Sequence, residues 1–251
     1  DVQKPDNAFV IGCVARNQHR KNIPRLMKAF KYFVDENNLK PKGARLMLHM
    51  DWQDYMGWNI EYMANYYDMQ DYLLPPMMGK LDEGGGVTEE KMVEIYNLMD
   101  IFALPTAGEG FGIPTAEALA CGKPVVITNY TSSYELVGAE KPEDDIPLWP
   151  QGNGPINGRD HLIDEDWSDR GCLVPYKDMW WDTPARAAPQ RAIVSERGMA
   201  EAFSRYYNDR SLVLEHGKNA RNYARKNYDW NGVVAEKWIN LFKRIEKETG
   251  L

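Results

Sequence analysis

Cysteine and histidine are scarce in this sequence, and long apolar runs are missing. Its 251 residues include three cysteines and four histidines, and the cysteines have none of the paired spacings that a zinc site or a disulfide framework uses. We therefore expect no metal site and a reducing compartment. No apolar stretch reaches the roughly 20 residues that span a bilayer, and no signal peptide is recognisable, so the expected location is the cytoplasm.

Positive charge is also in deficit. The chain has 30 Lys and Arg against 37 Asp and Glu, which gives a formal net charge of −7. A chain with this balance lacks the broad positive field that attracts nucleic acid or an anionic membrane, so no nucleic-acid partner is expected. The length suits one large domain with a sizeable core, and we predict a single domain over residues 1–251.

Short apolar runs and helical periodicities alternate along the chain. The runs predict strands at 9–15, 44–50, 72–74, 100–105, 125–127 and 171–175. The periodicities predict helices at 23–34, 58–67, 88–98, 114–121, 198–208, 211–226 and 230–247. This order predicts an α/β fold: a doubly wound parallel sheet of about six strands, helices on both faces and a helical C-terminus. Ligands of such sheets bind beyond the carboxyl ends of the strands.

The most informative segment is 109–126, with the sequence EGFGIPTAEALACGKPVV. Its glycines allow positive φ angles or the close approach of a ligand, and Pro114 suits the first position of a helix. The free N–H groups at the start of that helix point toward whatever lies above the sheet. Glu117 is favoured near a helix N-terminus by the dipole alone, and Glu109 by itself could be an ordinary loop acid. Together they are typical of a site for a polar ligand.

This segment resembles the signature of the retaining glycosyltransferases of the GT-B type, family 4 or glycogen-synthase-like, also called glycosyl transferases group 1. The signature has two glutamates separated by seven residues, with Gly-Phe-Gly after the first and Glu-Ala-x-Ala-x-Gly-x-Pro-Val around the second. The resemblance implies that Glu109 lies beside the donor sugar and Glu117 near the ribose of the nucleotide. It also implies that the donor contacts the backbone of Gly110, Phe111, Gly112 and Ile113.

A second match follows the first predicted strand. Arg16 and Lys21 fall on the family's Gly-Arg-x-x-x-x-Lys pattern, in which Ala15 replaces the glycine. A solvated basic loop ahead of a helix would look the same. Beside the glutamate motif we favour the functional interpretation, because a desolvated diphosphate requires nearby cations. The resemblance also places the nucleotide base at the loop that contains Lys80 and Leu81.

Two further segments match the family only in part or differ from it. Glu135 and Val137 match a Gly-Gly-x-x-Glu-x-Val motif whose glycines this chain lacks, whereas Ala220-Arg221 and Tyr228-Asp229-Trp230 match a C-terminal landmark. Residues 139–170 are rich in Asp, Glu, Pro, Gly and Trp, and we interpret them as an insertion. The insertion is either a structural flap or an acceptor site, since aromatic faces stack well on sugars.

The resemblance also implies a function for this chain as part of a larger enzyme. The chain would be the C-terminal, Rossmann-like donor-binding half of a GT-B enzyme, working with its own N-terminal domain, which this chain does not contain. The substrate would be a UDP- or GDP-linked sugar with no further cofactor. A hexosyl group would pass with retention to a carbohydrate, lipid or protein acceptor in carbohydrate biosynthesis, without a metal. The full-length protein would be cytoplasmic or peripheral to a membrane, and the isolated domain poorly active.

In this interpretation three residues carry the chemistry. Arg16 and Lys21 would stabilise the charge of the departing phosphate, and Glu109 would orient the sugar hydroxyls. Other classes stay open: a non-catalytic nucleotide-sugar-binding module, or a GT-B-fold epimerase or phosphorylase. A dinucleotide dehydrogenase is disfavoured, because no Gly-x-Gly-x-x-Gly follows the first strand.

Overall fold

A computed structural model describes residues 7–75, 86–139, 158–182 and 189–250. Its centre is a seven-stranded sheet with the strand order β3-β2-β1-β4-β5-β7-β6. Six strands are parallel, and β6 joins the edge antiparallel to β7. The strands are β1 (Phe9–Val14), β2 (Ala44–His49), β3 (Leu73–Leu74), β4 (Ile101–Leu104), β5 (Val125–Thr128), β6 (Trp167–Ser168) and β7 (Gly171–Val174). The predicted doubly wound α/β fold is confirmed.

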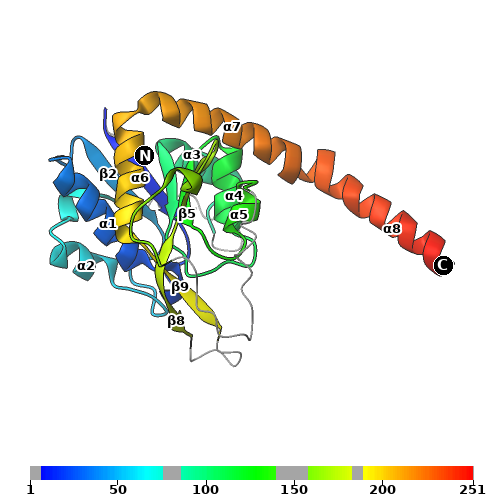
Figure 1. Ribbon diagram of the computed structural model, residues 1–251, viewed down its shortest axis with the longest axis horizontal. Coiled ribbons are helices and arrows are strands. Elements are labelled where there is room, and N and C mark those ends of the chain that lie inside the picture. Colours follow the sequence, from blue (N-terminus) through cyan, green and yellow to red (C-terminus); the bar gives the residue numbers. More distant parts are fainter. Residues whose placement is uncertain (1–6, 76–85, 140–157, 183–188, 251) are drawn as a thin grey trace.

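Helices cover both faces of this sheet (Figure 1). The described α-helices are α1 (Ile23–Glu36), α2 (Ile60–Tyr66), α3 (Glu89–Leu98), α4 (Ile113–Ala120), α5 (Ser133–Leu136), α6 (Glu196–Asn208), α7 (Arg210–Tyr228) and α8 (Ala235–Thr249), and α8 extends away from the sheet. Figure 1 shows α1 and α6 on one side and α3 and α4 on the other. The parallel strands need such crossover helices, and burial on both faces explains their unbroken apolar sequences.

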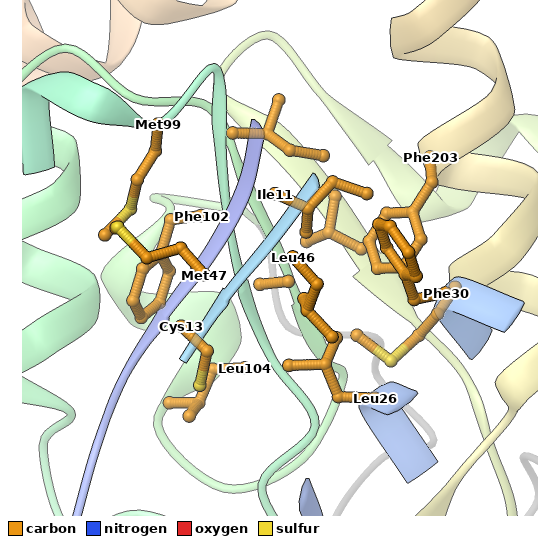
Figure 2. Packing of buried hydrophobic residues seen from close by; sticks show 14 of the residues in the cluster. Ile11, Cys13, Leu26, Phe30, Leu46, Met47, Met99, Phe102, Leu104 and Phe203 are labelled. Carbon is orange, nitrogen blue, oxygen red and sulfur yellow. The ribbon is translucent and has the colours of Figure 1, made fainter. Parts of the chain in front are cut away.

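Aromatic and aliphatic side chains fill the layers between sheet and helices. Phe33 of α1 packs edge-on against Phe9 of β1, with ring centroids 6.2 Å apart, and against Phe203 of α6, at 6.0 Å. Figure 2 shows Phe30 and Phe203 on one side of the strands and Met99 and Phe102 on the other. The buried core therefore extends through both layers, and it stabilises the loops at the strand ends indirectly by fixing the strands.

Side-chain caps begin several helices where the sequence places polar residues. Thr88 accepts a hydrogen bond from the backbone N–H of Lys91, as predicted. Asp209 caps α7 in the same way, and Asp229 caps the π-helical turn Trp230–Val234 that precedes α8. That turn continues directly into α8, so the last helix predicted over 230–247 is helical throughout, and only the π form of its first turn was not predicted.

Two features of the region after α5 were not predicted. Residues 158–170, the described end of the predicted insertion, contain β6, and Trp167 there packs on Tyr206 of α6 with centroids 5.4 Å apart. This end is structural, while residues 140–157 of the predicted insertion lie outside the described residues. The second feature is an antiparallel hairpin of β8 (Tyr176–Trp181) and β9 (Gln190–Val194).

Across the described ranges, no helix combines the length and the apolar character that a membrane crossing requires.

Candidate functional site

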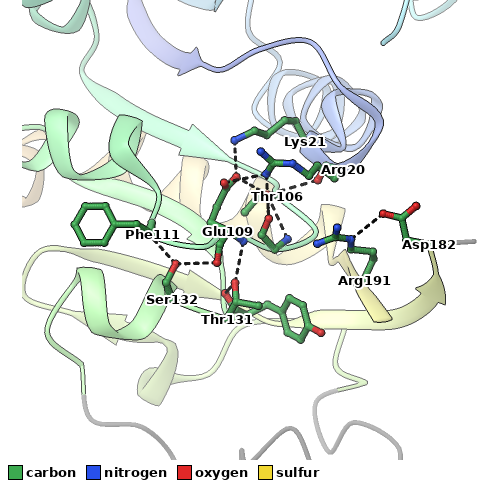
Figure 3. A network of polar contacts seen from close by, with 11 residues as sticks. Arg20, Lys21, Thr106, Glu109, Phe111, Thr131, Ser132, Asp182 and Arg191 are labelled. Carbon is green, nitrogen blue, oxygen red and sulfur yellow. Dashed lines mark hydrogen bonds and ion pairs between the residues drawn. The ribbon is translucent and has the colours of Figure 1, made fainter. Parts of the chain in front are cut away.

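Three loops meet at the carboxyl ends of β1, β4 and β5 (Figure 3). The loop after β1 contains a 3-10 turn, His19–Lys21, and the loop after β4 leads through Glu109 to α4. The backbone N–H of Ala107 donates to the carbonyl of Arg20 at 2.7 Å. From the loop after β5, the Thr131 hydroxyl accepts from the N–H of Glu109 at 2.9 Å. These bonds fix the three loops to one another.

The carboxylate of Glu109 is the centre of this junction. The ammonium group of Lys21 donates to Oε1 of Glu109 at 2.5 Å, and Nη1 of Arg20 donates to Oε2 at 2.9 Å. The hydroxyl of Thr106 donates to Oε1 at 2.7 Å. The side chains of Glu109 and Lys21 are only 9% and 6% exposed. The structure therefore brings two predicted residues, 88 positions apart in the chain, into a buried ion pair.

The surroundings determine the charge of Glu109. Burial would raise the pKa of this carboxyl group, but the hydrogen bonds from Lys21, Thr106 and Arg20 and the charge of Lys21 outweigh it, so the pKa lies below its ordinary value. Glu109 is therefore ionised at neutral pH. An ionised carboxylate can only accept hydrogen bonds, which suits it to orient hydroxyl groups.

The predicted donor-binding backbone lies directly after Glu109. Gly112 has φ +98°, and a Cβ there would lie 2.8 Å from Cδ1 of Leu136, so only glycine fits without strain. The hydroxyl of Ser132 supports the segment by donating to the carbonyl of Phe111 at 2.8 Å. Gly110, Phe111 and Ile113 are exposed. The backbone at the start of α4 is thus held in place from one side and open on the other, as an anion site at a helix N-terminus requires.

Glu117 has a partner that sequence reasoning missed. The hydroxyl of Tyr96, a side chain in α3 that is 1% exposed, donates to Oε2 of Glu117 at 2.7 Å. Burial, and then this hydrogen bond, raise the pKa of Tyr96, so the hydroxyl stays protonated and remains a donor. Glu117 is itself exposed. Tyr96 therefore fixes the carboxylate of Glu117 while leaving it accessible to a ligand.

Arg16 does not join this cluster. Its guanidinium is 57% exposed and donates from Nε to Oδ2 of Asp54 at 3.0 Å. The second cation that contacts Glu109 is instead Arg20, which the family motif does not include. The sequence feature that could have pointed to Arg20 is its position next to Lys21. Lys80 and Leu81 lie outside the described residues. Within the described part of the chain, no three His, Cys, Asp or Glu side chains gather as metal ligands would.

The part of the chain that contains these residues matches a known protein family. The model of the family "Glycosyl transferases group 1" matches residues 8–153, more than half of the chain. The chain is also similar to an O-antigen chain mannosyltransferase B from Escherichia coli, with 31% identity over 119 residues. That match covers 47% of this chain and 28% of the relative, so the chain aligns with less than a third of the relative's length.

Solved structures show the same fold. One neighbour is the C-terminal domain of a glycosyl transferase group 1 family protein, LpcC, from Francisella tularensis, with a TM-score of 0.55 and 15% identity. The likeness covers 88% of this chain and 86% of that domain. Another is TarM from S. aureus, in a complex that contains UDP, with a TM-score of 0.60, 16% identity, and coverage of 96% of this chain and 37% of TarM. These likenesses show that the fold is that of a GT-B glycosyltransferase domain.

The charge of Glu109 leads to a pH-dependent prediction. Because the folded pKa is depressed, its ion pair stabilises the fold above the ordinary pKa of 4.5, and the stabilisation is lost as the pH falls through the lower folded value. We expect Glu109→Gln to lower the free energy of unfolding by about 3 kcal/mol at neutral pH, since it leaves Lys21 buried without a counter-charge. The difference from wild type should shrink below about pH 4.5, measured by urea unfolding.

The control is Glu215→Gln, which changes an exposed glutamate on α7. It should alter stability by less than about 0.5 kcal/mol at any pH. A difference between wild type and Glu109→Gln that stays constant from neutral to acidic pH would contradict the assignment of an ionised, paired Glu109.

Proposed function

The chain belongs to the glycosyl transferases group 1 family, and we propose that it is the donor-binding domain of a retaining hexosyltransferase that uses a nucleoside diphosphate sugar. The observation that carries this proposal is the buried Glu109 carboxylate, held by Lys21 and Arg20 beside the N-terminus of α4. A group that accepts hydrogen bonds next to one that binds anions matches the two parts of a nucleotide sugar, the hydroxyl-bearing ring and the diphosphate.

The diphosphate would lie against the start of α4. The N-terminus of this helix attracts negative charge, and the exposed Gly110–Ile113 backbone allows close approach. Arg16 is available as a further cation, because its side chain is 57% exposed and its ion-pair partner is the Asp54 carboxylate, which also accepts from the backbone N–H of Met56. We propose that this guanidinium turns to the phosphate, where a cation would stabilise the charge that develops on the leaving group.

The sugar and the ribose would each be oriented by a glutamate. Glu109 would accept hydrogen bonds from the sugar hydroxyls, and Glu117, fixed by Tyr96, would accept from the ribose. The bond from the anomeric carbon to the phosphate oxygen would break, the acceptor oxygen would form its bond to that carbon from the same face, and the proton of the acceptor hydroxyl would pass to the departing phosphate oxygen. We assign no covalent nucleophile and no metal. Metal independence and retention are parts of the proposal, and an acceptor of carbohydrate, lipid or protein type would complete the reaction.

The partner that we propose for this domain is the N-terminal domain of a longer polypeptide. None of the side chains of α8, all within the described range, is buried. Trp238, Ile239 and Phe242 are 48%, 51% and 55% exposed and lie on one face of the helix. Figure 1 shows α8 extending away from the sheet. The likeness to a C-terminal domain of a family protein supports an N-terminal domain as the occupant of this face.

Nucleotide binding is the direct test of the donor site. We expect calorimetric titration of this chain with UDP, GDP and ADP to show one nucleotide binding equally well with and without EDTA. The double variant Arg16→Ala, Lys21→Ala should bind it roughly 100-fold more weakly, because it loses the Arg16 contact with the phosphate and the Lys21 charge that balances Glu109 beside the donor. The matched control is Lys243→Ala, Arg244→Ala on the exposed face of α8, which removes the same charge and should leave the affinity unchanged.

Two results would contradict this proposal. If no nucleotide binds to the folded chain, the site is not a donor site. If the double variant and its control bind equally well, the basic pair does not hold the phosphates. Circular dichroism of both variants would confirm that each retains its fold.

The α8 proposal predicts a difference in amide exchange. We expect residues 235–249 to exchange hydrogen at least about tenfold more slowly in a polypeptide that includes the N-terminal domain than in this chain, since docking protects helical amides. Phe242→Gln in the longer polypeptide should restore fast exchange, whereas Lys243→Ala should not. Equal exchange of α8 in both polypeptides would show that this face does not dock there.

A further inference from the structure

The hairpin of β8 and β9 is attached to the candidate site, although the proposed function does not use it. The backbone N–H of Ala192 in β9 donates to the carbonyl of Ala107 at 3.3 Å. The side-chain amide of Asn22 donates to the carbonyl of Ala192 at 3.2 Å. Strand β9 is therefore bonded to both of the loops that enclose Glu109.

A tyrosine from the loop after β5 also contacts the hairpin. The ring of Tyr130 packs edge-on against Tyr176 of β8, with centroids 5.6 Å apart, and its hydroxyl donates to the carbonyl of Gln190 at 3.1 Å. All three loops of the site thus contact the hairpin. A side chain that β9 directs toward these loops has a defined position relative to Glu109.

Arg191 is that side chain. Its Nη1 lies so close to Gly108 that a Cβ at this glycine would be 3.3 Å away. Its Nε donates to Oδ2 of Asp182 at 3.1 Å, and both side chains are 21% exposed. Among the described residues, Asp182 is the only hydrogen-bond partner of this guanidinium, and the bond uses Nε, so neither terminal amino group has a hydrogen-bond partner there. Terminal amino groups of arginine form the fork that binds carboxylates and phosphates bidentately.

The position of Arg191 separates it from the proposed diphosphate site. Phe111 and α4 follow Glu109 in the loop, whereas Arg191 lies against Gly108, which precedes it. Figure 3 shows Phe111 on one side of Glu109 and Arg191 on the other. A ligand group at Arg191 would therefore belong to the part of the substrate on the far side of the sugar from the diphosphate.

The charges in this region favour an acidic group. Arg20, Lys21 and Arg191 are three cations, and Glu109 and Asp182 are two carboxylates, so one positive charge is left uncompensated within this set. On this basis, which rests on the proposed function, we propose that Arg191 binds an oxyanion, a carboxylate or a phosphate, on the sugar or the acceptor that Glu109 faces. The site would then prefer an acidic substrate over its neutral counterpart.

Matched acidic and neutral ligands test this preference. The donor arm compares UDP-glucuronate with UDP-glucose, or GDP-mannuronate with GDP-mannose if the chain selects guanine. The acceptor arm compares glucose 6-phosphate with glucose in the presence of saturating nucleotide. Calorimetry should show the acidic member of one pair binding at least about tenfold more tightly to the wild-type chain, as expected for a charge-assisted contact. The arm that responds identifies which substrate carries the oxyanion.

Arg191→Gln should reduce that preference to within about twofold while leaving the affinity for the neutral ligand unchanged. Arg191→Lys should retain part of it, because the charge stays and the fork is lost. The control Arg197→Gln alters an arginine on α6 that is paired with Glu36 and should retain the full preference. Near-ultraviolet circular dichroism would show whether the tryptophans of the hairpin keep their environment.

The outcomes separate this inference from the proposed function. If the neutral nucleotide sugar binds but neither acidic ligand is preferred, or if Arg191→Gln keeps the preference, the inference is wrong and the donor site stands. If no nucleotide sugar binds at all, the proposed function fails and the inference fails with it.

Discussion

The ionised carboxylate of Glu109, nearly buried between Lys21 and Arg20, is the interaction on which the arrangement of this site depends. A carboxylate removed from water costs free energy unless cations and hydrogen-bond donors replace the lost hydration. Here the replacements come from the loops after β1 and β4, and the loop after β5 holds the backbone of the same residue. The charge of one side chain therefore determines how three loops meet.

Apolar packing elsewhere in the fold offsets the free-energy cost of burying charge at this junction. Apolar packing on both faces of the sheet, such as that of Phe33 between β1 and α6, fixes the strands without any contribution from the site. The loops at the strand ends can then hold charged residues and a glycine with a positive φ, Gly112 at +98°. The hairpin of β8 and β9, which lies outside the sheet, is bonded to these loops and places Arg191 beside them.

The sequence predicted much of this structure for identifiable reasons. Buried parallel strands have unbroken apolar runs, so β1, β2, β3, β4, β5 and β7 were found. Resemblance to the family singled out Glu109 and Lys21, but for contacts with the sugar and the phosphate, and their pairing with each other was not predicted. Arg20 and Tyr96 were missed because their contacts with Glu109 and Glu117 depend on packing between distant segments. The hairpin was missed because β8 is mostly half-exposed and has no clear apolar run. Arg16 was predicted by resemblance to the basic pair of the family, and that pattern does not show that Asp54 is its partner.

A crystal structure of this chain with a bound nucleoside diphosphate sugar would test the central claim most directly. The account predicts sugar hydroxyls within hydrogen-bonding distance, below about 3.2 Å, of the Glu109 carboxylate, and the diphosphate at the N-terminus of α4. A sugar bound elsewhere, with Glu109 contacting only Lys21, Arg20 and Thr106 as it does without ligand, would show that the carboxylate holds the loops together and does not bind the donor.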